Sequence, residues 1–318
     1  MRPDSLTAPL ATPPRRPPEL DVSQPLPPSL ARPLVDVAHL TGADVGSSFE
    51  PVLVDCRFDL ADPGAGEAGW REARIPGSRY LHLERDLSGP VQRGRSGRHP
   101  LPSPDALRAR FAELGVDADA PVVFLDAGDG AFAARAWWLA CWLGHPQAHV
   151  LDGGWRAWQA AGGEVETGPP AAPERAAGWP MRATLVPLAD ASDVLGTFRT
   201  QRPLVDARSQ QRFEGVKEPI DPVAGHIPGA RCMPYTENLD ADGRFRDAEA
   251  LHARWAPALG EDPAHAICYC GSGVTAAHNV LAAVAAGLPA PRLYVGSWSE
   301  WITDPSRPVA TGPGTAGA

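Results

Sequence analysis

The chain has 318 residues, of which 43% are hydrophobic, and its formal net charge is -9 at pH 7. This length can bury a sizeable core and favours two domains over one, while the acidic balance argues against nucleic acid or an anionic membrane surface as the main partner. No stretch approaches the roughly 20 consecutive apolar residues of a membrane span, and no signal-like apolar core follows Met1. Five cysteines are an odd number, which is unpromising for a disulfide framework. We therefore expect a cytoplasmic protein with reduced thiols.

Proline-rich segments divide the chain. Residues 1–32 contain three Pro-Pro pairs and no hydrophobic periodicity, so we predict a disordered tail there. A second proline-rich stretch begins at Pro169 and predicts a linker over residues 169–185. We expect domains at residues 33–168 and 186–312, followed by a short loose tail at residues 313–318.

The two predicted domains repeat one pattern. The segment Leu-Val-Asp-Cys-Arg at residues 53–57 returns as Leu-Val-Asp-Ala-Arg at residues 204–208, and Ile-Pro-Gly at residues 75–77 returns at residues 227–229. A paired tryptophan motif also recurs, and both of its tryptophans are separated from their counterparts by 143 residues: Trp155 and Trp158 lie opposite Trp298 and Trp301. The chain therefore reads as a tandem duplication of one α/β unit.

Each unit predicts the same order of elements. A short apolar strand ends in Asp-x-Arg, the Ile-Pro-Gly turn follows, and then come a helix, a strand, a loop, a long helix and a last strand. The predicted helices before the central strand are Asp105–Leu114 and Asp247–Leu259, the central strands are Val122–Leu125 and Ala266–Tyr269, and the last strands are His149–Leu151 and Leu293–Val295. Alternating strands and helices predict a mainly parallel sheet covered on both faces, with ligands bound beyond the carboxyl ends of the strands.

The most informative motif is Cys-Gly-Ser-Gly-Val-Thr at residues 270–275, between the predicted strand that ends at Tyr269 and an alanine-rich helical stretch. The free amides of a first helical turn, with the positive end of the helix dipole, stabilise an anion such as a thiolate. Gly271 and Gly273 allow the loop to turn its N–H groups inward, and Ser272 and Thr275 add hydroxyl donors. Cys270 is therefore a candidate nucleophile.

The first copy of the repeat serves as an internal control. It has Ala127 opposite Cys270 and keeps the glycines, but it lacks the thiol and the hydroxyls. Features that both copies share, namely the Asp-x-Arg pairs, the Ile-Pro-Gly turns and the paired tryptophans, are interpreted as architecture. Arg212 lies opposite Ala61, so its charge belongs to the second copy alone and makes it a candidate for holding an anionic substrate.

These residues together resemble the rhodanese superfamily, specifically its tandem-domain sulfurtransferases, over roughly residues 33–312. The segments that carry the resemblance are residues 206–208, 212–213, 225–230, 270–276 and 296–301. The resemblance implies an inactive N-terminal domain and a catalytic C-terminal domain whose site faces the cleft between them. It also implies a two-step covalent reaction, in which a cysteine persulfide takes a sulfane sulfur from a donor and passes it to cyanide, a thiol or thioredoxin. No metal or cofactor is expected.

The loop is similar to that of the 3-mercaptopyruvate sulfurtransferases. The resemblance makes Cys270 the persulfide carrier, Ser272 a group that polarises or protonates the donor, and Arg212 the ligand of the donor carboxylate; Gly271, Gly273, Val274 and Thr275 form the persulfide cradle. Family members of this type commonly carry a second arginine where this chain has Asp221, and a histidine where it has Arg74. We expect that Arg74 supplies the missing positive charge to the cleft. Thiosulfate is an alternative donor.

Other interpretations compete with this one. A non-enzymatic persulfide carrier is possible for such a loop, whereas a Cys-x5-Arg phosphatase needs a guanidinium at position 276, which is alanine. Cys268 and Cys270 could begin a metal site, but two ligands are too few and Cys268 fits a buried strand position better. His226 is interpreted as a structural residue of its turn. His99 and His278 have no visible partner in the sequence, and neither is assigned a role.

Overall fold

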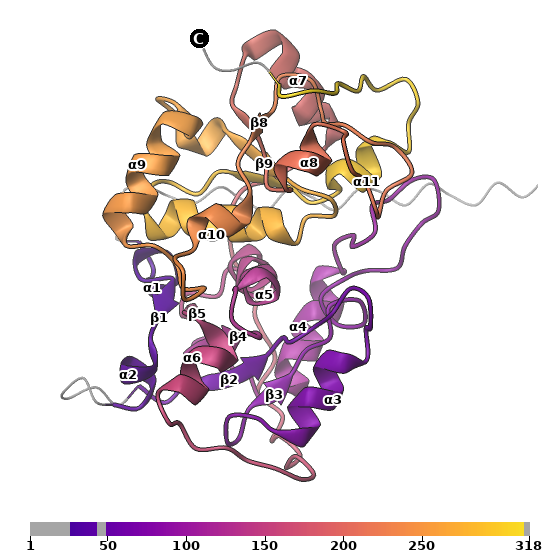
Figure 1. Ribbon diagram of the computed structural model, residues 1–318. Helices are drawn as coiled ribbons and strands as arrows, with labels where there is room; N and C mark the ends of the chain where they lie inside the picture. The colour runs from indigo at the N-terminus through magenta and orange to yellow at the C-terminus, as the bar shows by residue number, and fades with distance from the viewer. Residues whose placement is uncertain (1–25, 43–48, 315–318) are drawn as a thin grey trace, which may run out of the picture.

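The structure is a computed structural model that describes residues 26–42 and 49–314. Most of the predicted N-terminal tail (residues 1–25) and the end of the predicted C-terminal tail (residues 315–318) lie outside the described residues. The described part folds as two lobes, one from each predicted domain (Figure 1). None of the helices in these ranges is long and apolar enough to cross a bilayer.

The N-terminal domain contains a five-stranded sheet in the order β1-β5-β4-β2-β3, in which every neighbouring pair is parallel. Its strands are β1 (Leu34–Val35), β2 (Val52–Asp55), β3 (Arg79–Tyr80), β4 (Val122–Leu125) and β5 (Ala148–Leu151). Its helices are α1 (Pro28–Ala31), α2 (Val37–Leu40), α3 (Ala65–Glu72), α4 (Pro104–Glu113), α5 (Ala131–Trp142) and α6 (Gly154–Ala160). All residues of β4 and β5 are buried, as expected for central parallel strands between two helical layers.

The C-terminal domain repeats this topology with the sheet order β6-β10-β9-β7-β8, again parallel throughout. Its strands are β6 (Leu188–Ala189), β7 (Leu204–Asp206), β8 (Arg231–Cys232), β9 (Ile267–Tyr269) and β10 (Arg292–Tyr294). Its α-helices are α7 (Ala191–Thr200), α8 (Gln210–Phe213), α9 (Ala248–Leu259), α10 (Thr275–Ala285) and α11 (Ser297–Trp301), and two 3-10 turns are η1 (Tyr235–Asn238) and η2 (Pro263–His265). The predicted fold class, two tandem α/β units with mainly parallel sheets, is confirmed.

The shared motifs do the same structural work in both copies. The guanidinium of Arg57 binds Asp55 at 2.8 Å and lies over the Trp155 ring. In the second copy, Arg208 binds Asp206 at 2.6 Å and lies over the Trp298 ring. The first ion pair holds the end of β2 against α6, and the second holds the end of β7 against α11.

The two domains meet through α5 and α10, which lie side by side between the lobes (Figure 1). Both helices are rich in buried alanines, which lets their backbones approach closely. Their side chains belong to one hydrophobic cluster that extends from the N-terminal into the C-terminal domain. Because each helix begins directly after a strand-to-helix loop, this packing also brings the two repeated loops together.

Two predicted boundaries need correction or detail. Residues 28–31 belong to α1 rather than to a disordered tail, because Leu30 joins the core and Trp137 Nε1–H donates to the Ser29 carbonyl at 3.2 Å. The predicted linker contains no helix or strand over residues 169–185. It is nevertheless held against the N-terminal domain, since the buried Trp179 ring donates to the Val116 carbonyl at 2.8 Å.

Candidate active site

Cys270 follows β9 directly and lies in the loop that leads into α10. The Gly273 amide donates to its Sγ at 3.1 Å, so the loop curls back over the sulfur. Gly273 has φ +82°, and a Cβ built there would lie 2.5 Å from the Val295 carbonyl oxygen. Only glycine therefore fits this position without a shift of the backbone.

A second layer of contacts fixes the backbone of the loop. Ser297 adopts the left-handed region with φ 54°, and its Oγ accepts the Cys270 N–H at 3.1 Å. The first amides of α11 close the other side, because Trp298 donates to the Cys270 carbonyl and Ser299 to the Gly271 carbonyl, both at 2.9 Å. The strained Ser297 thus anchors Cys270, the candidate nucleophile.

The equivalent loop in the N-terminal domain is filled by a side chain of its own. The Asp126 carboxylate is buried and accepts the amides of Gly128, Gly130, Phe132 and Ala133 at 2.9 to 3.2 Å. At the 143-residue spacing of the repeat, these amides correspond to those of Gly271, Gly273, Thr275 and Ala276. The first copy therefore shows that this loop geometry turns four N–H groups onto one carboxyl group, whose pKa burial raises to about 6.

His99 comes from the N-terminal domain and reaches into the Cys270 loop. A hydrogen bond of 2.7 Å joins its Nδ1 to Ser272 Oγ, and both residues are buried. Burial, together with the charges of Arg135 and Arg98, lowers the pKa of His99 to about 3. The imidazole is therefore neutral at physiological pH, with one nitrogen free to accept a proton and one able to donate.

Arg135 projects from α5 and ties the loops of the two domains together. Its guanidinium is buried and donates to the carbonyls of Leu87, His99 and Gly273 at 3.2 to 3.4 Å. Burial lowers its pKa to about 10, which still leaves the group charged at neutral pH. The coulombic interaction with Cys270 opposes the effect of burial and raises the pKa of Arg135.

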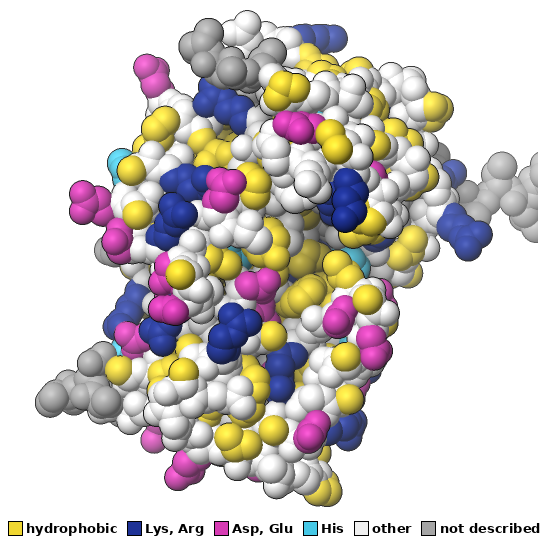
Figure 2. All heavy atoms as spheres, in the orientation of Figure 1, with side chains coloured by type: hydrophobic (Ala, Val, Ile, Leu, Met, Phe, Trp, Pro, Cys, Tyr) yellow, Lys and Arg dark blue, Asp and Glu magenta, His cyan; other side chains and the backbone are white. Residues whose placement is uncertain are grey.

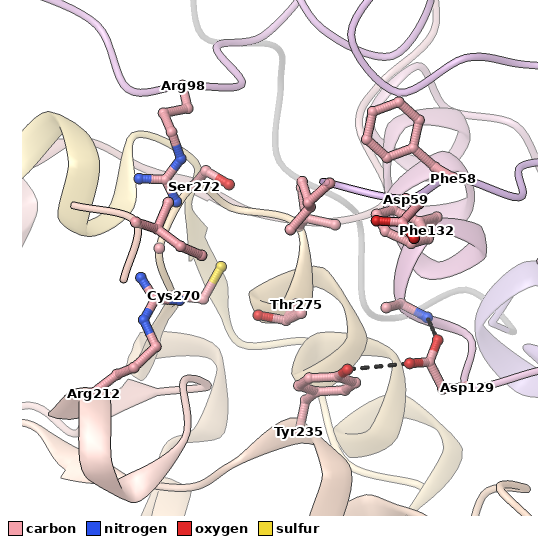
Figure 3. A pocket seen from close by; sticks show the side chains of 15 residues that line it. Phe58, Asp59, Arg98, Asp129, Phe132, Arg212, Tyr235, Cys270, Ser272 and Thr275 are labelled. Atoms are coloured by element: carbon pink, nitrogen blue, oxygen red, sulfur yellow. Dashed lines mark hydrogen bonds between the residues drawn. The ribbon is translucent and has the colours of Figure 1, made fainter. Parts of the chain in front are cut away.

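Two further arginines lie beside the loop. Arg212 from α8 is held by Glu218 and Asp221, with its Nη2 at 2.8 Å and 3.0 Å from a carboxylate oxygen of each. Arg98 of the N-terminal domain forms an ion pair with the same Asp221. Figure 3 shows both guanidinium groups beside Cys270.

The Cys270 loop and the two arginines, Arg98 and Arg212, line a cavity of about 340 Å³ between the two domains. Hydrophobic side chains are visible deep in the hollow between the lobes (Figure 2). The C-terminal domain contributes the Cys270 loop, Arg212 and Tyr235 to its lining, and the N-terminal domain contributes Phe58, Asp59, Arg98, Asp129 and Phe132, among others. Across the cavity from Arg212, the Tyr235 hydroxyl donates to Asp129 at 3.1 Å (Figure 3).

Most predicted site residues converge on this cavity. Cys270, Gly271, Ser272, Val274, Thr275 and Arg212 line it, and Gly273 supports it from behind through its bond to the sulfur. Cys268 is buried, as expected for a strand residue. His226 is also structural, because its ring stacks on Phe213 and its Nδ1 bonds the Phe213 carbonyl at 2.8 Å.

The prediction for Arg74 is wrong. Its side chain is completely buried away from the cavity, where it pairs with Glu166 and donates to the Gly168 carbonyl at 2.8 Å. Its guanidinium also lies over the Trp70 ring. Arg74 therefore fastens the Ile-Pro-Gly turn to the end of its own domain, and its charge does not reach the cleft.

Sequence reasoning missed Arg98 and His99, which both reach the Cys270 loop, and Arg135. His99 is 173 residues away from Ser272 along the chain, so no local spacing connects them. The available signal was the basic, glycine-punctuated run at residues 93–99, which interrupts an otherwise acidic chain. His278 lies near the cavity but is structural, because it bonds the Asp129 carbonyl and stacks on Phe245. Among the residues described, no cluster of His, Cys, Asp and Glu is arranged to hold a metal ion.

Comparison with known proteins agrees with this geometry. The family model for the rhodanese-like domain matches residues 43–161 and 189–304. A probable 3-mercaptopyruvate sulfurtransferase of Pseudomonas aeruginosa is 51% identical over 264 residues, which cover 82% of this chain and 92% of that protein. A putative thiosulfate sulfurtransferase of Mycobacterium tuberculosis is 39% identical over 289 residues, covering 88% of this chain and 97% of the relative.

A solved structure leads to the same family. The 3-mercaptopyruvate sulfurtransferase from Leishmania major superposes with a TM-score of 0.74 at 31% identity, covering 84% of this chain and 73% of that one. The chain belongs to the rhodanese-like family. It is a sulfurtransferase with two tandem rhodanese domains, as the sequence predicted.

Proposed function

We propose that this enzyme takes the sulfur of 3-mercaptopyruvate onto Cys270 as a persulfide and passes it to a thiophilic acceptor. The observation that carries the proposal is the 2.7 Å hydrogen bond between Ser272 and His99 beside a sulfur that already accepts a loop amide. A hydroxyl linked to a neutral imidazole can move a proton in either direction. Breaking a carbon–sulfur bond next to a carbonyl requires such a proton.

In the first half-reaction, the Cys270 thiolate attacks the donor sulfur. The new S–S bond forms as the carbon–sulfur bond breaks, and the electron pair passes into the enolate of pyruvate. The S–H proton of the donor passes through Ser272 and His99 to that enolate, so pyruvate leaves and the persulfide remains as an anion. Arg212 holds the donor carboxylate through a charge-assisted hydrogen bond from Nη1, the guanidinium nitrogen that Glu218 and Asp221 leave free.

The persulfide is an anion, and the Cys270 loop is suited to hold it. Support comes from the N-terminal copy, where four corresponding amides bind the Asp126 carboxylate. That copy has Ala127 in place of the nucleophile and a filled cradle, which supports an inactive N-terminal domain. In the second half-reaction an acceptor thiolate or cyanide attacks the outer sulfur and releases Cys270 as a thiolate.

We further propose that a small thiol or a thioredoxin-like protein is the acceptor and that the enzyme works in the cytoplasm. Leu60 and Ile220 line the cavity and are 58% and 47% exposed, which leaves apolar surface at its mouth for an acceptor protein. All five cysteines are unpaired thiols, which fits a reducing compartment.

Thiosulfate is a second candidate donor. It is a dianion, and two guanidinium groups, those of Arg98 and Arg212, lie beside the loop. The 39% identical relative carries a thiosulfate sulfurtransferase name. With thiosulfate no enolate forms, so the donor reaction does not require the Ser272–His99 pair.

The donors are distinguished by kcat/KM for 3-mercaptopyruvate and for thiosulfate, measured with cyanide as the common acceptor. We expect a higher kcat/KM for 3-mercaptopyruvate, and we expect Ser272→Ala to lower it by about tenfold or more while leaving the thiosulfate reaction largely unchanged. Equal losses with both donors, or a wild-type preference for thiosulfate, would overturn the assignment of the donor.

A further inference from the structure

A segment of the N-terminal domain is docked onto the start of α11 in the C-terminal domain. A Cβ on Gly97 would lie 2.5 Å from the Gly296 carbonyl oxygen and 2.8 Å from Ser299 Oγ, so the two backbones are in direct contact there. The next residue, Arg98, donates its backbone N–H to Ser299 Oγ at 3.1 Å. Figure 1 shows this part of the chain as a purple loop that rises from the lower lobe beside α11. These contacts fix the backbone position of Arg98 and so direct its side chain toward the Cys270 loop.

The Arg98 side chain is held by a carboxylate that it shares with Arg212. Asp221 pairs with Arg98 through Oδ1 and with Arg212 through Oδ2, the latter at 3.0 Å. Its side chain is only 3% exposed, whereas that of Arg98 is 32% exposed and lines the cavity. Asp221 therefore neutralises part of the charge and fixes the position of both guanidinium groups.

One edge of each guanidinium remains available. Arg98 uses Nη1 for Asp221, and Arg212 uses Nε and Nη2 for Glu218 and Asp221. A Cβ on Gly271 would lie 2.8 Å from Arg98 Nη2 and 3.5 Å from Arg212 Nη1. Within the described residues, neither of these two nitrogens has a hydrogen-bond partner. Two unused N–H edges, one from each domain, therefore face the residue next to the nucleophile (Figure 3).

We propose that Arg98 is a donor-binding residue of the N-terminal domain, which together with Arg212 recognises an anionic donor, and that Asp221 positions both arginines. The inference rests on the proposed function, since it concerns the donor of the same reaction. An oxyanion placed over Gly271 accepts one N–H from each domain, in a charge-assisted pair. The sulfur of the same molecule then lies beside Cys270. Donor binding in this way requires both domains.

The test compares Arg98→Gln with Arg98→Lys and with Arg95→Gln. Arg95 lies in the same segment, is exposed, and does not line the cavity, so its variant is a matched control for the loss of one charge. Donor KM and kcat are measured for 3-mercaptopyruvate and thiosulfate with dithiothreitol as an uncharged acceptor, and Tm is recorded for each variant.

We expect Arg98→Gln to raise donor KM about tenfold to a hundredfold with a much smaller change in kcat. Arg98→Lys keeps the charge but loses the planar fork, so its KM should lie between those of Arg98→Gln and wild type. Arg95→Gln should match wild type. If Arg98→Gln keeps the wild-type donor KM and only lowers Tm or kcat, the ion pair is merely a domain contact and the proposal is wrong.

Should Arg98→Gln fail to fold, Arg98→Lys carries the test. A lysine lacks the planar group that joins Asp221 to the donor, so a wild-type donor KM in that variant would also contradict the proposal. Failure of the proposed function is separable from failure of this inference. It would be seen in the wild-type enzyme, as an absence of sulfur transfer from either donor.

Discussion

The neutral state of His99 has a direct consequence for the chemistry. Its pKa, lowered to about 3 mainly by burial, means that the imidazole becomes charged only in strong acid. Above about pH 5 it remains the same neutral partner of Ser272, so the usual titration of a histidine near pH 6.5 should be absent from the donor reaction. In the proposed mechanism, the reaction at Cys270 therefore depends on a residue from the other domain.

A pH profile of a His99 variant tests whether the imidazole stays neutral during the donor reaction. We expect His99→Asn to lower kcat/KM for 3-mercaptopyruvate about a hundredfold, because the proton relay through Ser272 is lost. The ratio of wild-type to variant kcat/KM should stay constant from about pH 5.5 to about pH 8, since His99 does not change its protonation there. A ratio that changes around pH 6.5 would mean that His99 titrates in this range and that its neutral role is wrong.

The strand-to-helix loop is the element on which the site depends. The loop can curl over the sulfur only with glycine at position 273. The backbone there is left-handed, and a Cβ would overlap the Val295 carbonyl oxygen. Gly229, in the Ile-Pro-Gly turn of the same domain, has nearly the same φ of +81° but open space around it. Alanine substitutions at the two positions therefore distinguish the free-energy cost of a left-handed backbone, which both share, from the cost of steric overlap, which only position 273 has.

We predict that Gly229→Ala lowers the free energy of unfolding by about 1 kcal/mol, the usual cost of a left-handed alanine. Gly273→Ala should cost at least about 1 kcal/mol more, because its methyl group overlaps the Val295 carbonyl. Gly273→Ala should also lower kcat/KM about tenfold or more, since the Gly273 amide moves away from the sulfur. Denaturant unfolding and steady-state kinetics on both variants measure this. Equal stability and activity in the two variants would contradict the role of position 273.

Elements encoded by contiguous residues could be predicted from the sequence. The apolar run Val122–Leu125 is β4 as predicted, and the predicted helix after Cys270 is α10. The repeat made the topology of both sheets predictable, because each copy corroborates the other. Short segments such as α1 were missed, because the proline-rich sequence around Pro28 is typical of a tail. Its helix depends on tertiary contacts with Trp137 and β5, which the local sequence does not indicate.

At the scale of the whole molecule, the candidate site is shared between the domains. The C-terminal copy provides Cys270 and its loop, and the N-terminal copy provides Arg98 at the cavity and His99 and Arg135 against the loop. These contributions could not be read from the sequence, because they depend on how α5 packs against α10 and on where residues 92–99 dock. Arg74 was misassigned for the same reason. Its charge is satisfied by Glu166, which is 92 residues away along the chain.

Intact-protein mass spectrometry can show whether sulfur passes through a persulfide on Cys270. After incubation with 3-mercaptopyruvate and removal of the excess, wild-type protein should carry one additional sulfur atom, which disappears when cyanide or a thiol is added. Cys270→Ser should gain no sulfur under the same conditions. A sulfur that is still acquired by Cys270→Ser, or one on the wild-type protein that no acceptor removes, would contradict a transferable persulfide on Cys270.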